Sequence, residues 1–244
     1  MSARRLSTIM VKTCSTKTLA LDTATERGSV ALLEGNDVIA ELRLCSAVTH
    51  SARLLRSVEF LLGSAGWKLC DLDLIAAGVG PGSFTGIRIG LATALGIAQT
   101  LDIPFAGVSG LDALAHQVSL PNAHLAIAMD AKRSQIYYAE YQTDHDRVAM
   151  VLRPRLWHPA DLAARVTRRP LYITGDAASR YLEALRARGR KKVPHYVKAE
   201  LYVAGSIGRL ALRRRRHWRS GRELRCEPLY IRLPDARTPK GSRN

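Results

Sequence analysis

The sequence predicts an α/β protein made of two strand-led units in series, which we expect to form two lobes with a cleft between them. Short apolar runs bounded by turn residues alternate with longer amphipathic stretches, as strands and helices do. This order is clear over residues 18–108 and recurs in a shorter, looser form over residues 124–188. The 244 residues, 47% hydrophobic and 24% charged, suffice for real cores and exclude disorder, collagen and coiled coil.

The first unit begins with three expected strands. Residues 18–25 read TLALDTAT, an apolar run that ends in an Asp-Thr turn, and the strands over 28–33 and 38–44 flank a turn that contains Gly35 and Asn36. The chain then continues as α-β-α-β. The expected elements are a helix over 51–65, a strand over 74–79, a glycine-rich loop, a helix over 87–101 and a strand over 104–108.

The second unit is expected to begin near residues 108–111. Residues 124–130 and 135–142 form an expected antiparallel pair. The later expected elements are helices over 159–166, 177–188 and 200–216, a strand over 171–174 and an extended segment over 228–233 that packs back. The predicted domains are an extension over 1–17, an N-terminal lobe over 18–108, a smaller lobe over 109–199, and a basic helix and tail over 200–244 that packs back on the N-terminal lobe. The extension is interpreted as disordered or as the result of a start codon placed upstream of Met10, with a transit peptide as the alternative.

The formal net charge of +16 is concentrated in the second half of the chain. Residues 1–108 carry ten Lys and Arg against nine Asp and Glu, whereas residues 109–244 carry 27 against 12. Such a field concentrates nucleic acid, although an arginine-rich genome composition would give the same count. The basic tail contains Arg209, Arg213, Arg214, Arg215, Arg216, His217, Trp218, Arg219, Arg222 and Arg225.

Two interpretations of this tail stay open. In the first, Arg213, Arg214, Arg215, Arg216 and Arg219 follow tRNA phosphates while Trp218 stacks on a base. In the second, the arginines are solvated and the leucines of the helix pack inward.

Four cysteines without C-x-x-C spacing indicate a reducing compartment. The longest apolar stretch, residues 86–101, contains Arg88 and Gln99. We therefore expect a soluble, cytoplasmic protein that neither spans nor binds a membrane.

The helix over 51–65 has an apolar stripe of Leu54, Leu55, Val58, Leu61, Leu62 and Ala65. Phe60 points away from that stripe, beside Arg53. An outward aromatic next to Arg is typical of the centre of a protein interface. The alternative is that the chain's own tail covers Phe60.

The helix over 87–101 has no charge beyond Arg88 and is apolar nearly all round. A sheet covers only one side of such a helix, so a neighbouring helix or another subunit must cover the rest. Gly90, Ala94 and Gly96 would let a second helix approach closely. With Arg53 and Phe60, the predicted partner interface therefore comprises Ile87, Gly90, Leu91, Ala94 and Leu95.

A distinctive loop joins the strand over 74–79 to this helix. It consists of Gly80, Pro81, Gly82, Ser83, Phe84, Thr85, Gly86, Ile87 and Arg88, which we call the signature loop. It lacks the Lys-Ser/Thr of a Walker A loop and the glycine spacing of a dinucleotide fingerprint. Two interpretations remain: an anion-binding loop at a helix N-terminus, or a tight turn capped by Ser83 or Thr85.

GPGSFTGIRIG, with LALDTAT and HSARLL before it and VSGLDALA, MDAKRSQIYYAEY and EPLYIR after it, resembles the TsaB (YeaZ) family. The resemblance is dense from Thr18 to Tyr141 and thin afterwards. It implies a two-lobed, actin-like (ASKHA, ribonuclease H-like) α/β fold with a reduced second lobe. It also implies that the chain is needed, with the related TsaD and the ATPase TsaE, to place the threonylcarbamoyl group on adenosine 37 of tRNAs that read codons beginning with A.

The groups for catalysis are incomplete in this sequence. TsaD-type relatives hold a metal with His-x-x-x-His, whereas His50 is followed at that spacing by Leu54. Turns that would approach phosphates read Asp22-Thr23-Ala24 and Asp130-Ala131-Lys132 without glycine, and residues 175–178 match the adenosine-side turn only partly. No catalytic or metal residues are therefore assigned, and ATP or ADP is expected to bind only weakly or at the interface of a complex.

From these observations we expect a non-catalytic partner subunit. It would form a heterodimer with TsaD, or a homodimer when TsaD is absent, and would reach TsaE and tRNA through the complex. The alternatives are a tRNA-binding module that uses the basic half and a weak nucleotide-binding, actin-like protein.

Overall fold

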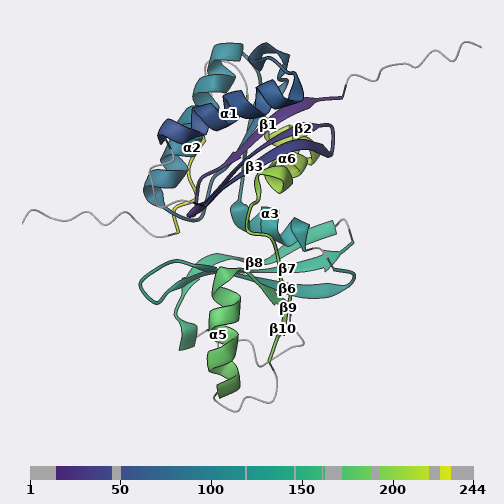
Figure 1. Cartoon of the computed structure of the whole chain (residues 1–244). Helices are drawn as coiled ribbons and strands as arrows, with labels where there is room; N and C mark the ends of the chain where they lie inside the picture. Colours follow the sequence, from purple (N-terminus) through teal and green to yellow (C-terminus); the bar gives the residue numbers. More distant parts are fainter. Residues whose placement is uncertain are drawn as a thin grey trace, which may run out of the picture.

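The protein consists of two lobes, one above the other in Figure 1, as seen in a computed structural model. The structure describes residues 15–45, 51–118, 120–145, 147–160, 162, 172–187, 193–219 and 226–231.

The first lobe contains a five-stranded sheet in the order β3-β2-β1-β4-β5. Strands β1, β2 and β3 pair antiparallel, and β4 and β5 continue the sheet in parallel with β1. The strands are β1 (Lys17–Asp22), β2 (Arg27–Glu34), β3 (Asp37–Cys45), β4 (Leu74–Gly78) and β5 (Phe105–Val108).

The second lobe repeats this topology in the order β10-β9-β6-β7-β8. Strands β6, β7 and β8 pair antiparallel, and β9 and β10 are parallel to β6. They are β6 (Ala123–Asp130), β7 (Ile136–Asp144), β8 (Arg147–Trp157), β9 (Tyr172–Thr174) and β10 (His195–Tyr196). The two sheets match strand for strand, which confirms the predicted duplication, and the short β9 and β10 account for the reduced second lobe.

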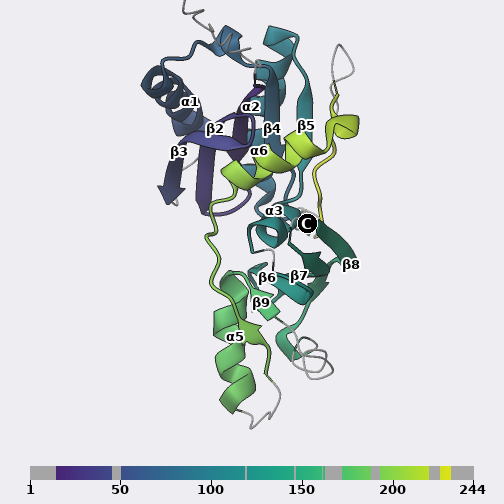
Figure 2. The same cartoon turned by 90° about the vertical axis from the view of Figure 1, so that its right-hand side faces the viewer.

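Helices cover both faces of each sheet (Figures 1 and 2). Helices α1 and α2 pack on one face of the first sheet and α6 on the other, because successive strand residues point to opposite sides. Helix α3 lies between the two sheets, and α5 covers the outer face of the second. The helices are α1 (Ser51–Ala65), α2 (Phe84–Leu101), α3 (Gly110–Gln117), α5 (Asp176–Ala187) and α6 (Ala204–Arg213), with short 3₁₀ turns η1 (Leu69–Asp71) and η2 (Arg215–His217).

One hydrophobic core runs through both lobes. It includes Ala20 of β1, Leu111 of α3, Leu125 of β6 and Leu210 of α6, none of them more than 2% exposed. The two sheets therefore share buried apolar surface through α3. The chain also passes between the lobes twice, first from β5 to β6 and then from β10 to α6.

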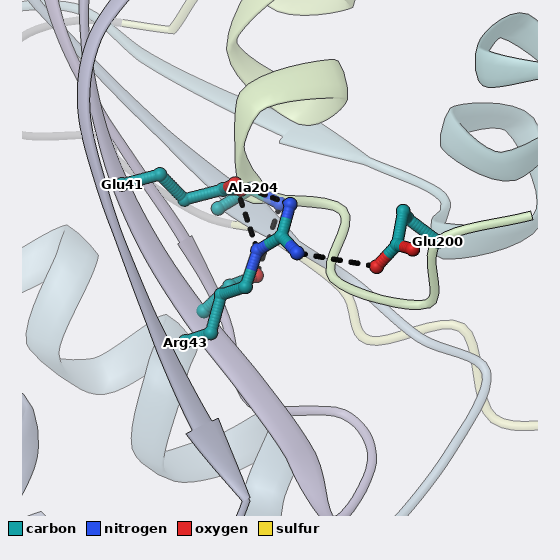
Figure 3. Close-up of polar contacts among 5 residues, drawn as sticks. Glu41, Arg43, Glu200 and Ala204 are labelled. Atoms are coloured by element: carbon teal, nitrogen blue, oxygen red, sulfur yellow. Dashed lines mark hydrogen bonds and ion pairs between the residues drawn. The ribbon is translucent and has the colours of Figure 1, made fainter.

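The second crossing, between β10 and α6, is fastened to β3 (Figure 3). Arg43 donates to Glu200 at 3.2 Å and to Glu41 at 3.3 Å. The first turn of α6 is held in turn by the amide of Ala204, which donates to the Ser29 hydroxyl at 3.1 Å. Arg43 and Glu200 are about half exposed, so their ion pair contributes at most about 1 kcal/mol and mainly sets the path of the crossing.

Most predicted elements are found within two or three residues of their expected bounds, but helix α3 and two strands were missed. The alternation of apolar and arginine residues in β8 could have revealed it, and Pro154 within that run suits the edge position that β8 occupies. Strand β10 is too short to produce a pattern. Of the helix predicted over 159–166, residues 161 and 163–166 lie outside the described part of the chain.

By length and composition alone, helix α2 is long and apolar enough to cross a membrane. One side of the helix packs in the core of the first lobe, where seven of its 18 residues are buried against the sheet and the turn after β1. It begins three residues earlier than predicted because Ser83 caps it.

Glycines at the start of α2 allow it to lie directly on that turn. A Cβ at Gly82 would lie 2.0 Å from the carbonyl oxygen of Ala24, and one at Gly86 would lie 2.1 Å from that of Thr23. Backbone cannot yield as a flexible side chain can. Glycine at positions 82 and 86 therefore allows the backbone of α2 and of the loop before it to lie close to the backbone of the turn after β1.

We predict that Gly86→Ala lowers the free energy of unfolding by about 2–4 kcal/mol, because the added methyl group forces α2 away from the turn. Gly96→Ala in the same helix is the matched control: nothing lies within 4 Å of its Cβ, so it should raise stability by about 0.5–1 kcal/mol through helix propensity alone. Urea unfolding of both variants measures the difference. Equal effects would contradict the close-packing argument.

Candidate functional site

The outer face of α1 exposes large apolar side chains. Phe60 is 64% exposed and Leu55 is 52% exposed. The outward position of Phe60 was predicted, whereas the assignment of Leu55 to the core was wrong. Leu55 lies at the margin of the apolar stripe, and the buried side chains are Leu54, Ser57, Val58, Leu61 and Leu62.

Four of the residues predicted for the partner interface on α2 belong to the chain's own core instead. Ile87, Gly90, Leu91 and Ala94 are buried against the sheet and the turn after β1, so a docking subunit cannot reach them. Leu95 is half-buried. The surface of α2 that a partner could contact is formed by Thr85, Arg88, Ala92 and Gly96, which are exposed.

The error has a simple physical cause. An apolar helix with small residues can sink deep into its own fold, because neighbouring backbone comes close enough to cover several sides. At Gly90, for example, a Cβ would lie 2.3 Å from the Thr23 hydroxyl oxygen. The absence of charge on α2 therefore indicated burial, but burial within the same chain.

The polar groups of the signature loop bind the chain itself. The Ser83 hydroxyl accepts from the Gly86 amide at 3.2 Å, the Ser83 amide donates to the Ala24 carbonyl at 2.7 Å, and the Thr23 hydroxyl donates to the Gly86 carbonyl at 2.7 Å. This geometry supports the capped turn, with Ser83 as the cap, over the anion-binding loop.

The C-terminal segment packs back on the first lobe, as predicted, and contacts the signature loop, which was not predicted. The Leu229 amide donates to the Val79 carbonyl at 2.8 Å. Tyr230 lies 4.9 Å from the ring of Phe84 and accepts a hydrogen bond from Arg88 at 3.1 Å. Arg88 in turn covers the Phe84 ring at 3.7 Å. Residues about 140 positions apart in the sequence thus form one cluster that fixes the loop.

A cavity of about 580 Å³ opens between the lobes beside this cluster. Its walls include residues from all three turns that the sequence suggested as remnants of a nucleotide site. They are Ala24 after β1, Asp130, Ala131 and Lys132 between β6 and β7, and Asp176 at the start of α5.

The polar groups of these turns are engaged with one another. Asp176 accepts a hydrogen bond from the Asp130 amide at 2.7 Å, and Asp130 accepts one from the Lys132 amide at 2.9 Å. The Lys132 ammonium lies 3.1 Å from the Glu26 carboxylate, and this ion pair bridges the two lobes across the cavity. Carboxylates thus line this wall of the cavity.

Gly175 has φ +108°, and a Cβ there would lie 2.1 Å from the carbonyl of Ala128. This residue therefore allows the turn before α5 to approach β6, which is a structural role.

The described residues contain no group of three or more His, Cys, Asp and Glu side chains suited to a metal ion. His50 lies outside the described part of the chain. His124 pairs with Glu140 at 2.8 Å, and His145 pairs with Asp144 at 2.9 Å.

Several residues of the basic tail have structural contacts. Arg214 donates to Asp112 of α3 at 2.9 Å, and Asp112 also accepts from the Tyr141 hydroxyl of β7 at 2.9 Å. Trp218 donates to the Ala211 carbonyl at 2.8 Å and is half-buried against the core, which argues against the stacking role predicted for it. Leu210 is buried and Leu212 packs against the same core. Arg222 and Arg225 lie outside the described residues.

Asp22, at the end of β1, is a buried carboxyl beneath this site. Its side chain is fully enclosed, and burial raises its pKa from 3.8 to about 6, against the opposing effect of hydrogen bonds from the Ala24 and Thr23 amides. Because the pKa is higher in the folded chain than in the unfolded chain, ionisation of Asp22 destabilises the fold. This cost is absent below about pH 4 and complete above about pH 6.

We predict that Asp22→Asn becomes increasingly stabilising, relative to the unsubstituted chain, between pH 4 and pH 7. The difference in unfolding free energy should grow by about 3 kcal/mol over this range, because two pKa units correspond to about that energy. Urea unfolding of both proteins at several pH values measures it. Parallel stability curves would show that Asp22 ionises freely in the folded chain.

The sequence model of the family described as tRNA N6-adenosine threonylcarbamoyltransferase, TsaD, matches residues 45–205, more than half of the chain. The tRNA threonylcarbamoyladenosine biosynthesis protein TsaB of Escherichia coli is 39% identical over 57% of this chain and 64% of its own length. TsaB of Bacillus subtilis is 38% identical over 51% of this chain and 54% of its own length. The matched region thus spans about half to two thirds of these two relatives.

Two solved structures from Pseudomonas aeruginosa have the same fold. A protein described as similar to peptidase YeaZ superposes with a TM-score of 0.71 at 27% identity, over 89% of this chain and 100% of its own. YeaZ itself gives 0.66 at 26% identity, over 82% and 93%. The chain belongs to the TsaD family, and within it to the TsaB (YeaZ) group.

Proposed function

We propose that this chain is a non-catalytic subunit of the machinery that makes threonylcarbamoyladenosine at position 37 of tRNAs that read codons beginning with A. In this proposal, the outer surface of α1 and α2 docks on a TsaD subunit. The observation that carries the proposal is the exposure of Phe60 and Leu55 on a helix whose opposite side is fully packed. The names of the TsaB relatives supply the pathway.

Energetics favour a partner on this surface. Burying a side chain the size of Phe stabilises a contact by about 1.5–3 kcal/mol, and aromatic side chains dominate interface energies. Beside α1, the small exposed residues Ala92 and Gly96 leave room for another helix on α2. TsaD is related to this chain, so its own pair of equivalent helices would complete a four-helix contact.

The same geometry permits a second copy of this chain in place of TsaD. A two-fold axis through the outer face would bring Phe60 of both copies into one interface. We propose that the homodimer forms when TsaD is absent and gives way to the heterodimer. TsaE and tRNA would then be reached through the complex.

The proposed role is to hold the active site of TsaD in its working state. A subunit acts in this way when it binds the working conformation of its partner more tightly than the idle one. The non-catalytic part of the proposal is supported by the interlocked polar groups of the signature loop and cavity turns, which are occupied in holding the fold.

We predict that Phe60→Glu weakens TsaD capture at least 100-fold and abolishes tRNA modification, because it places a charge in a desolvated contact. Ile39→Glu is the matched control. It places the same charge at a 46% exposed apolar residue on β3, and should retain both TsaD capture and tRNA modification. Co-purification and modified-nucleoside analysis measure the outcome. Leu91 is unsuitable for this test, because it is 4% exposed and a charge there would unfold the chain.

If Phe60→Glu stayed folded, bound TsaD and supported modification like the control, the docking proposal would be wrong. Thermal unfolding of each variant separates loss of docking from loss of fold.

A second expected outcome concerns nucleotides. We propose that the isolated chain binds ATP with a Kd weaker than about 1 mM, since carboxylates at Asp130 and Asp176 face the cavity and the loop polar groups are occupied. Calorimetry with ATP and Mg²⁺ measures this. Micromolar binding would favour the alternative, a nucleotide-binding, actin-like protein.

A further inference from the structure

The chain carries an exposed group of arginines just beyond the end of α6. We call Arg215, Arg216 and Arg219 the arginine cluster. All three side chains are exposed, and two of them lie on the η2 turn that follows the helix. None of the three lines the cavity between the lobes.

The fold holds the cluster in place. The backbone of Arg219 pairs with Phe105, the first residue of β5, through two hydrogen bonds of 2.7 and 2.8 Å. Trp218 packs on the core, and the Arg215 guanidinium lies 5.5 Å from its ring. The Arg219 guanidinium donates to the Trp218 carbonyl at 3.1 Å. The arginines therefore project from a fixed platform at the β5 edge of the sheet.

Within the described part of the chain, no carboxylate forms an ion pair with any member of the cluster. Arg214, next to them, is bound by Asp112, and Arg43 is bound by Glu41 and Glu200. The negative end of the α6 dipole does not explain the cluster, because this effect fades within the last turn, which ends at Arg213.

We propose that the arginine cluster binds the phosphate backbone of tRNA. Guanidinium groups match phosphate geometry with two parallel hydrogen bonds, and the half of the chain that bears the cluster has 27 basic against 12 acidic residues. The choice of tRNA among RNAs rests on the proposed function. Trp218 serves as the platform for Arg215 and not as a stacking surface for a base.

The position of the cluster is compatible with simultaneous docking of a protein. Helix α6 and the α1–α2 pair lie on opposite faces of the first sheet, and the cluster lies at the β5 edge between them (Figure 2). Only residues 102–104 separate the end of α2 from Phe105. A tRNA that reaches a partner on α1 and α2 could therefore extend around this edge.

The test compares two triple variants of the full chain with equal loss of charge. One carries Arg215→Gln, Arg216→Gln and Arg219→Gln. The control carries Arg147→Gln, Arg153→Gln and Arg155→Gln on β8, where all three arginines are exposed. The probe is an unmodified transcript of a tRNA that reads codons beginning with A, and fluorescence anisotropy is measured from 50 to 300 mM KCl.

We expect the cluster variant to bind about 10- to 100-fold more weakly at low salt. The slope of log affinity against log salt should fall by about 2–3, because each lost phosphate contact removes about 0.7–0.9. The control should change both quantities much less. Equal losses in the two variants would mean that net charge alone attracts RNA, and an unchanged slope in the cluster variant would also overturn the proposal.

If the triple variant unfolds, Arg216→Glu is used in its place. Arg216 is exposed, and its replacement leaves the Trp218 platform intact. It should weaken tRNA binding while TsaD capture stays normal. Failure of the docking proposal would instead show as normal TsaD capture by Phe60→Glu. That variant should leave the affinity of the isolated chain for tRNA unchanged. The two proposals can therefore fail separately.

Discussion

The contact between the signature loop and the turn after β1 fixes the start of α2 and the loop on which residues 229–230 pack. Backbone meets backbone there, since Gly82 and Gly86 leave no room for a side chain against Ala24 and Thr23. This contact sets the depth of α2 in the fold, and thereby decides which of its sides remains available to another protein. The same contact occupies the Ser83 amide and the Gly86 carbonyl, and the Ser83 hydroxyl occupies the Gly86 amide.

A second constraint joins the lobes. The apolar core continues from the first sheet through α3 to the second, and Asp112 of α3 is bound by both Arg214 and Tyr141. Glu26 and Lys132 add a bridge across the cavity. A protein that works by closing its lobes around a ligand needs a compliant junction, whereas a shared core and several cross-links suit a scaffold that presents surfaces.

The surfaces themselves are separate. The apolar side chains of α1 lie on one face of the first sheet, while the arginine cluster lies at the β5 edge and α6 on the opposite face. One surface is suited to desolvated contact with a helix pair and the other to a hydrated polyanion. Separate positions let one subunit touch a protein and an RNA at the same time.

By itself, the sequence determined the duplicated α/β order and the outward Phe60, because periodicity acts over a few residues. It left the signature loop open between an anion-binding loop and a turn capped by Ser83 or Thr85, and the structure selected the Ser83 cap. The sequence also carried the resemblance to TsaB. Only the tertiary structure decided that Ile87, Leu91 and Ala94 face the chain's own core, that Leu55 lies at the surface, and that Trp218 and Arg214 hold α6 in place. Those roles depend on backbone and side chains that come from distant parts of the chain, and a local pattern shows that a residue is buried without showing what buries it.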